Sequence, residues 1–262
     1  MNYTEYLENF NAADAAHETV KWIKEWFEKN GGYSKTAVIG ISGGKDSTVA
    51  AALCVEALGK NQVIGVLMPN GRQYDIADSY AVINTLGIQH FEINIKNAYN
   101  SICDEIKEYT KILSSQCTIN LPARLRMSTL YAVSQCVGGR VVNTCNLSED
   151  YIGYSTRWGD SVGDFAPLAN FTTDEVIKIG LELGLPEKLI LKTPSDGLCG
   201  LTDEEKIKVP YHKINEYIRL GKLDDELAKK TIKELHEKNL FKLEPMPSFN
   251  YFELLNYKKH TI

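Results

Sequence analysis

The chain has 262 residues, of which 44% are hydrophobic and 24% are charged, a composition typical of a globular protein that excludes a disordered or fibrous one. Its 29 basic and 34 acidic residues give a net charge of −5, which provides no broad positive field to attract nucleic acid or anionic lipid. No apolar stretch reaches the roughly 20 residues of a membrane span and the first residues resemble no secretory signal, so we expect a cytoplasmic protein that binds neither nucleic acid nor a membrane.

The first half of the chain alternates helix-like segments with strand-like runs. Apolar residues at helical spacing mark the helices, and short runs that are apolar on both faces mark the strands. In chain order we expect a helix at 13–29, a strand at 36–42, a helix at 48–58, a strand at 62–69, a helix at 76–86, a strand at 90–95, helical stretches to 112, a helix led by Pro122 that runs to about 137, and a strand at 140–146. This alternation predicts an α/β fold with a doubly wound parallel sheet flanked by helices.

The second half of the chain has a different character. Loops rich in Gly, Ser and Asp follow Asn146 as far as Thr172, and helices are expected at 173–183 and towards the C-terminus. The length allows one core of ordinary size and no second enzyme. We therefore expect a single domain over 1–262, in which the portion from about 172 to 262 is a helical appendage.

A glycine-rich loop follows the first predicted strand, at the edge of the sheet where doubly wound folds bind ligands. Two glycines let backbone amides approach a ligand, two serines add hydroxyl donors, and the following helix contributes its positive N-terminal end, so the loop suits a polyphosphate. A carboxylate in such a loop would repel phosphate unless a divalent cation lay between them, and we therefore expect Mg²⁺. The loop consists of Ser42, Gly43, Gly44, Lys45, Asp46 and Ser47.

Two better-known phosphate loops do not fit these residues. A Walker A loop requires Gly at position 39 and Ser or Thr at position 46, where this chain has Ile39 and Asp46, and a G-x-G-x-x-G spacing is not set by Gly40 and Gly43. A tight strand–helix turn without a ligand is the structural alternative. The hexapeptide S-G-G-K-D-S directly after a buried strand resembles the pyrophosphate loop of the N-type ATP pyrophosphatases, which split ATP into AMP and pyrophosphate.

Two later segments resemble the ammonia-dependent NAD synthetases within that group. The first is N-L-P-A-R-L-R-M at 120–127, closed by Tyr131, and the second lies at 144–168. Arg124 and Arg126 are about 200° apart around a helix axis, so at most one of them faces a given pocket. The other could reach a neighbouring subunit, because NAD synthetases are dimers with their substrate near the subunit interface.

The resemblance also implies roles for single residues. Glu149 follows the fourth predicted strand at the same edge of the sheet as Asp46, so the two carboxylates could converge on one Mg²⁺. Solvated arginines, loop turns and helix-start acids are the purely structural alternatives. By resemblance, ATP contacts are expected from Arg72, Thr144 and Ser195, substrate contacts from Arg124, Arg126, Tyr131, Arg157, Asp160, Asp164 and Lys192, and metal contacts from Asp46, Glu149 and Ser195.

The same resemblance implies a reaction in which ATP activates the nicotinate carboxylate of deamido-NAD (nicotinic acid adenine dinucleotide). The carboxylate attacks the α-phosphorus of ATP, pyrophosphate leaves into the loop, and ammonia then displaces AMP to give NAD. Lys45 and Asp46, with Mg²⁺, would act catalytically by stabilising the charge on the leaving pyrophosphate. We thus expect a homodimeric ligase with ATP as co-substrate, Mg²⁺ as cofactor and ammonia as nitrogen donor.

Three other functions stay open from the sequence. An ATP pyrophosphatase of this kind could amidate xanthosine monophosphate, as GMP synthetases do, or thiolate tRNA, and a non-catalytic module could hold ATP without turnover. The chain also departs from the NAD synthetase pattern in two places. Residues 170–173 lack the expected Lys, and Phe241 stands where many members carry His.

Overall fold

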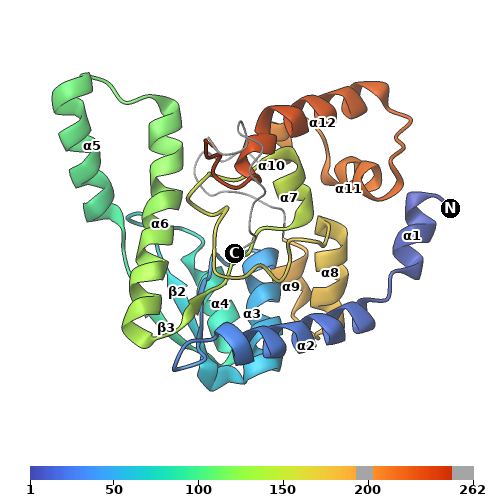
Figure 1. Ribbon diagram of the computed structural model, residues 1–262, viewed down its shortest axis with the longest axis horizontal. Coiled ribbons are helices and arrows are strands. Elements are labelled where there is room, and N and C mark those ends of the chain that lie inside the picture. The colour runs from blue at the N-terminus through green and yellow to red at the C-terminus, as the bar shows by residue number, and fades with distance from the viewer. Residues whose placement is uncertain (193–202, 250–262) are drawn as a thin grey trace.

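The computed structural model describes residues 1–192 and 203–249, and a four-stranded parallel sheet lies at the centre of this part of the chain (Figure 1). The strands lie in the order β3-β2-β1-β4, with Val38 of β1 opposite Ile64 of β2 and Val141 of β4. The order reverses between β1 and β4, which confirms the predicted doubly wound sheet. The strands are β1 (Ala37–Gly40), β2 (Val63–Leu67), β3 (Gln89–Glu92) and β4 (Arg140–Val141).

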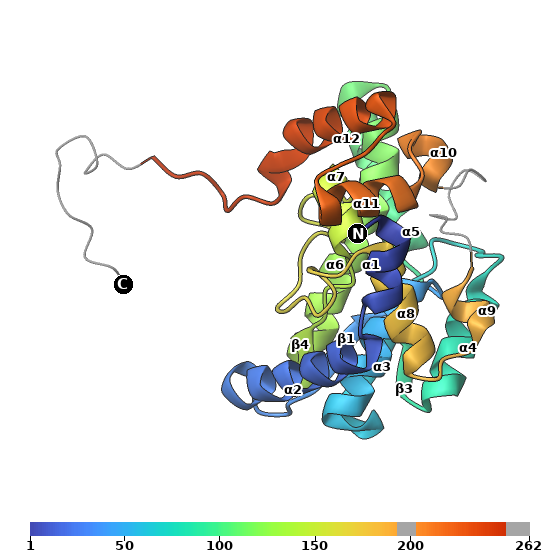
Figure 2. The ribbon, with the colours of Figure 1, turned by 90° about the vertical axis from the view of Figure 1, so that its right-hand side faces the viewer.

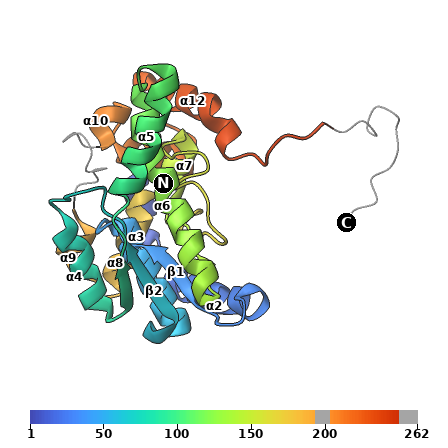
Figure 3. The ribbon, with the colours of Figure 1, turned by 90° about the vertical axis from the view of Figure 1, so that its left-hand side faces the viewer.

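Helices cover both faces of this sheet (Figure 3). On one face, Ile23 and Phe27 are fully buried against the sheet and its helices, and each such side chain contributes about 1.5–3 kcal/mol through the hydrophobic effect. On the other face, Met127 and Leu130 pack against Val38 and Val141. The first layer contains α2 (Ala12–Asn30), α3 (Lys45–Leu58), α4 (Ile76–Leu86), α8 (Thr173–Glu182) and α9 (Glu187–Ile190), and the second contains α6 (Ser115–Val137) with α5 (Lys96–Thr110) beside it.

Two of the predicted strands differ from the observed ones. β3 ends at Glu92 rather than at residue 95, and its side chains are mostly exposed because it is an edge strand with one neighbour. β4 has two residues instead of the expected seven positions at 140–146. On the edge away from β1, the segment at Asp164 and Phe165 pairs with this part of the chain: the Asp164 side chain accepts the Val141 N–H, and the Phe165 carbonyl accepts the Asn143 N–H.

Several helix boundaries also differ from the sequence-based ones. α6 begins at Ser115 rather than at Pro122, because the Ser114 side chain caps it by accepting the Cys117 N–H at 3.2 Å. Pro122 lies inside the helix and costs it one backbone hydrogen bond. The sequence did not lead us to expect α1 (Tyr3–Asn9), α7 (Leu147–Ile152) or α9, all of which have ten residues or fewer.

A third apolar cluster joins α7 to the helices of the C-terminal part of the chain, on the side of the molecule away from α2 (Figure 2). Ile152 of α7 packs there with Ile214 and Ile232. α8 and α9, which we had grouped with a helical appendage, pack instead in the main core. No helix in the described ranges is long and apolar enough to cross a membrane. The remaining elements are α10 (Asp203–Ile207), α11 (Tyr211–Leu220), α12 (Glu226–Asn239) and the short 3-10 helices at Lys60–Gln62 and Leu240–Lys242.

Candidate active site

The loops after β1 and β4 lie side by side at the point where the strand order reverses. In doubly wound sheets this switch point forms a crevice at the carboxyl ends of the strands, because neighbouring connections leave it on opposite faces. The first loop is Ser42–Gly44, which leads into α3, and the second is Asn143–Asn146, which leads into α7. The contact between Asp46 and Asn146 joins the two.

The first loop is held in shape by its own serines and by α4. Gly43 has a positive φ of 80°, and a Cβ there would lie 2.8 Å from the backbone N of Ser79, so both the conformation and the close approach of α4 require glycine. The Ser42 and Ser47 hydroxyls lie 3.0 Å apart, and the Gly44 N–H donates to Ser42 Oγ at 3.2 Å. These hydroxyls, which we expected to face a ligand, therefore brace the loop while α3 begins directly behind it.

Two carboxylates and one ammonium group meet between the loops. Lys45 is 4% exposed, and its Nζ donates to Asp46 Oδ2 at 2.8 Å. Asn146 Nδ2 donates to the other Asp46 oxygen at 2.9 Å. Burial and then the charge of Asp46 raise the pKa of the Glu149 carboxyl well above its ordinary value, although Lys45 and the Asn146 N–H oppose the shift. A pair of carboxylates that resist being ionised together is the arrangement that a bound cation relieves.

Of the two predicted arginines, Arg126 faces this crevice. Its Nε donates to the Met68 carbonyl at the end of β2, at 3.1 Å. Burial lowers the pKa of Arg126, and the negative charges of Asp160 and Asp75 oppose that shift. Arg124 instead donates from Nε to the Arg157 carbonyl at 3.3 Å, on an exposed part of α6. The two side chains thus leave α6 in different directions, as their angular separation around the helix axis predicts.

Asp160 lies where the crevice meets the segment around α12. Its carboxylate accepts the Thr156 N–H at 3.0 Å. Lys242 donates to the Gly153 and Ser155 carbonyls at 2.6 and 3.0 Å, and burial lowers the pKa of Lys242 while Asp160 opposes that shift.

Phe241, one of the two departures from the family pattern, packs beside Arg157 rather than beside an acid. Its ring centroid lies 5.1 Å from the Arg157 guanidinium carbon, which also lies 5.0 Å from the Trp158 ring. The guanidinium thus lies within cation–π distance of two aromatic rings, which stabilises its positive charge.

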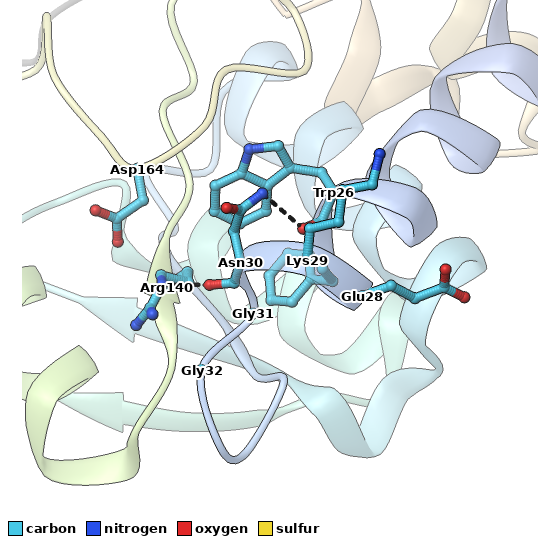
Figure 4. Close-up of a pocket in the computed structure, with 9 residues that line it drawn as sticks. Trp26, Glu28, Lys29, Asn30, Gly31, Gly32, Arg140 and Asp164 are labelled. Atoms are coloured by element: carbon cyan, nitrogen blue, oxygen red, sulfur yellow. Dashed lines mark hydrogen bonds between the residues drawn. The ribbon is translucent and has the colours of Figure 1, made fainter. Parts of the chain in front are cut away.

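Tyr131 and Asp164 form a separate pair on the far side of β4. Burial and then Asp164 raise the pKa of Tyr131. Asp164 borders a hollow of about 560 Å³ at the end of α2, which Arg140 and Trp26 also line (Figure 4). Arg140 there donates from Nε to the Asn30 carbonyl at 2.7 Å. The predicted substrate residues therefore divide between the crevice and this hollow.

The remaining predicted residues are spread along the edge of the crevice. Lys192 donates to Asp78 at 2.5 Å, at the start of α4 and next to Gly43. Arg72 is exposed and lies 5.4 Å from the Tyr74 ring, and Thr144 is half-buried in the second loop. Ser195 falls outside the described residues.

Two residues that sequence reasoning missed contact the crevice from α11. Tyr211 places its ring 6.0 Å from Lys45 Nζ, and the Asn215 side chain accepts a hydrogen bond of 2.5 Å from the Ser148 hydroxyl. They are four residues apart and therefore share one face of the helix. That spacing was visible in the sequence, but nothing local indicated that this face meets the loops.

The oxygen atoms in the crevice fit Mg²⁺. Mg²⁺ is usually held by one or two carboxylates together with water and substrate phosphates, and Asp46 and Glu149 supply two carboxylates. Within residues 1–192 and 203–249, no cluster of three or more His, Cys, Asp and Glu side chains is arranged to hold a metal without such help. The two carboxylates thus fit a cation that takes its other ligands from outside these residues.

The comparisons with known proteins agree with the geometry. The sequence model described as NAD synthase matches residues 15–252. The chain is 36% identical to the NH(3)-dependent NAD(+) synthetase of Pyrococcus horikoshii, over 81% of this chain and 82% of that protein. It is 33% identical to the enzyme of the same name from Methanocaldococcus jannaschii, over 94% of this chain and 93% of that protein.

Two solved structures are similar in fold. The NMN synthetase from Francisella tularensis superimposes with a TM-score of 0.85 and 31% identity, over 93% of this chain and 100% of that one. The NH3-dependent NAD synthetase from Campylobacter jejuni, in complex with the nitrate ion, gives a TM-score of 0.72 and 27% identity, over 92% and 99%. With the matched residues extending from the first layer of helices past α12, this chain belongs to the NAD synthase family.

Proposed function

We propose that this protein is an ammonia-dependent NAD synthetase that amidates deamido-NAD at the expense of ATP. The observation that carries the proposal is the meeting of Lys45, Asp46 and Glu149 at the switch point of the sheet, directly behind a glycine loop. A carboxylate is a poor acyl donor because oxide does not leave. Adenylation solves this: the nicotinate carboxylate bonds to the α-phosphorus, pyrophosphate departs, and ammonia then displaces AMP from the mixed anhydride.

The chain's own groups would stabilise the charge that develops on pyrophosphate. The N-terminal end of α3, which begins directly after the glycine loop, brings a partial positive charge, and the Lys45 ammonium adds a full positive charge that is almost excluded from water. Because these groups are fixed before the reaction, they stabilise the transition state without reorganising. Arg126 and Asp160, on the opposite wall, are proposed to bind the dinucleotide.

We further propose that Asp46 and Glu149 hold Mg²⁺ when ATP binds, with Ser195 as a third ligand by family resemblance. Mg²⁺ supplies charge neutralisation for the phosphates when bound. Asp46 Oδ2 accepts a hydrogen bond from Lys45 and Oδ1 accepts one from Asn146, and because a carboxylate oxygen has two lone pairs, each can also face a cation. Arg72 and Thr144 remain proposed ATP contacts, and Lys192, Arg157, Tyr131 and Asp164 remain proposed substrate contacts.

The direct test is a product assay. Protein is incubated with deamido-NAD, MgATP and ammonium chloride, and NAD, AMP and pyrophosphate are quantified. Equal amounts of the three products are expected. Parallel reactions with xanthosine monophosphate test the GMP synthetase-like alternative, and amidation of that substrate alone would overturn the proposal, as would ATP binding without any turnover.

A second substrate has a specific observation in its favour. The similar structure with the TM-score of 0.85 is an NMN synthetase, and this likeness exceeds that to the Campylobacter jejuni NAD synthetase in both TM-score and identity. The corresponding acid, nicotinate mononucleotide, has the same carboxylate and lacks the adenylate half. The ratio of kcat/KM for the two acids decides between them.

We also propose a homodimer in the cytoplasm. Ile112 and Ile119, at the α5–α6 connection, are 78% and 54% exposed, and Arg124 points outward from the same helix. The five cysteines within the described residues are all free, as expected in a reducing compartment. Sedimentation of the protein should give a dimer, and Ile112→Glu with Ile119→Glu should give a monomer if this face is the interface.

A further inference from the structure

A buried chain of polar side chains connects α11 to Asp46, and no step of the reaction above uses it. It contains Asn146, Ser148 and Asn215, each of which is 0% exposed, and Thr173, which is 4% exposed and joins Ser148 to Asn146. Buried polar groups are costly unless they are hydrogen-bonded, so a continuous buried chain of this kind fixes the orientation of every member.

The amide of Asn146 can take only one orientation. Its Oδ1 accepts the backbone N–H groups of Ser148 and Glu149 at 3.0 and 3.1 Å, as the N-cap of α7. The opposite rotamer would turn an NH₂ group towards two N–H donors, which is unfavourable. Nδ2 is therefore directed at Asp46 Oδ1, 2.9 Å away.

Hydrogen bonds from Thr173 and to Asn215 further fix the orientation of Asn146 and Ser148. Thr173 Oγ1 donates to Asn146 Oδ1 at 3.4 Å, and the Thr173 N–H donates to Ser148 Oγ at 3.0 Å. With its acceptor site used, the Ser148 hydroxyl donates its proton to Asn215 Oδ1 at 2.5 Å. Thr173 lies in the segment that lacks the family's Lys, so in this chain that segment supports the loop of β4.

We infer that Asn146 is a positioning residue for Asp46, and that Asn215 of α11 acts on the same carboxylate through Ser148, Thr173 and Asn146. Lys45 holds one Asp46 oxygen and Asn146 holds the other, so the carboxylate plane is fixed before nucleotide and cation arrive. A preset carboxylate binds with a smaller entropic cost than one that must be ordered. The inference rests on the proposed function in one respect, which is that ATP is the nucleotide bound at Asp46.

The informative variant is Asn146→Asp. Aspartate caps helices as well as asparagine does, so the two N–H groups of α7 keep their acceptor. The donor towards Asp46 is replaced by an oxygen, which repels the carboxylate. We expect the Kd for MgATP, measured by calorimetry without the acceptor substrate, to rise about ten- to a hundredfold, the usual effect of losing a hydrogen bond to a charged group.

Asn215→Leu tests the remote end of the chain, and Asn239→Ala is its matched control. Asn239 also bonds to α7, donating to the Ile152 carbonyl at 3.2 Å, but at the end that is far from Asp46. Asn215→Leu should raise the Kd for MgATP about threefold or more, since the Ser148 hydroxyl loses its acceptor. Asn239→Ala should change thermal stability and leave this Kd as it is.

A double-mutant cycle separates positioning from general stability. In an Asp46→Asn background, Asn146→Asp should weaken MgATP binding by less than about twofold, because there is no carboxylate left to position. The inference is overturned if Asn146→Asp leaves the Kd for MgATP unchanged or tightens it, or if its effect persists in the Asp46→Asn background. If binding follows these expectations but no NAD forms, the inference stands and the proposed substrate is wrong.

Discussion

Glu149 and Glu175 occupy the same local position in two helices but meet opposite surroundings. Each is the third residue of a helix and closes a capping box, Glu149 with Asn146 at the start of α7 and Glu175 with Thr172 at the start of α8. Beyond the box, Glu149 faces Asp46. Glu175 instead faces Arg219, whose guanidinium donates to its two oxygens at 2.7 and 2.5 Å.

The pKa values of the two carboxyl groups consequently move in opposite directions. Burial and Asp46 raise the pKa of Glu149. Burial also acts to raise the pKa of Glu175, but hydrogen bonds from Arg219, from the Tyr6 hydroxyl at 2.6 Å and from the Thr172 N–H outweigh it, and the pKa is lowered. A carboxylate whose oxygens are all satisfied stabilises the fold, whereas one that faces a second carboxylate is prepared for a cation. The capping motif thus positions the carboxylate at the start of the helix. The residue that it meets in the tertiary structure determines whether it stabilises the fold or is available to a cation.

The largest effect on stability is expected when Glu175 loses its partner Arg219. Arg219→Met leaves a fully buried carboxylate without its counter-charge, and removing one partner of a buried ion pair usually costs about 3–5 kcal/mol. Urea denaturation should show this loss in the free energy of unfolding. The double variant Arg219→Met with Glu175→Met should recover most of it, and a single variant that unfolds like the unchanged protein would contradict the assignment.

The sequence predicts the surroundings of each glutamate only where the interacting residues are close together in the chain. The loop at 42–47 and the sheet follow from local rules, because a glycine turn after a buried strand is visible in a few residues. The start of α7 also carries a local signal, the capping-box spacing of Asn146 and Glu149, although we did not predict this short helix. The partners carry no such signal: Asp46 and Asn146 are 100 residues apart, and Arg219 and Glu175 are 44 apart. No periodicity or cap signal specifies such pairs, because they depend on how whole helices pack.

Glu149→Gln should have the opposite effect on stability to Arg219→Met. The substitution keeps the side-chain oxygen that accepts the Asn146 N–H and removes a charge that Asp46 repels. We therefore expect unchanged or higher thermal stability without Mg²⁺. Activity should fall about a hundredfold, or about 2.7 kcal/mol in the barrier, because a proposed metal ligand is lost. Glu175→Gln is the control, and it should lose stability instead.

The two acids should also give opposite slopes of stability against pH. Glu175 binds its proton more weakly in the folded state, so its contribution is present above about pH 4.3 and is lost as the pH falls through its lowered pKa. Glu149 binds its proton more tightly in the folded state. Its ionisation therefore costs stability, from about pH 4.3 up to its raised pKa.

Melting temperatures measured between pH 3 and 8 without Mg²⁺ test this. The difference between the unchanged protein and Glu149→Gln should grow as the pH rises, and the difference from Glu175→Gln should shrink as the pH falls below about 4.3. Added Mg²⁺ should reduce the first difference and leave the second. Parallel curves for all three proteins would show that the two environments do not differ in this way.

The smallest effect is expected at Lys192, whose partner lies nearer to solvent than either glutamate. Lys192 is 32% exposed and Asp78 is 40% exposed, and ion pairs of this kind contribute about 0–1 kcal/mol and weaken with salt. Lys192→Met should therefore lower the free energy of unfolding by less than about 1 kcal/mol, and 1 M NaCl should remove the difference. Its proposed contact with substrate adds a second readout, because losing that contact would raise KM for deamido-NAD, which a small loss of stability alone does not do. If KM is unchanged and only a salt-sensitive loss of stability appears, Lys192 serves to hold the start of α4 against Gly43 and belongs with Arg219 as a structural cation.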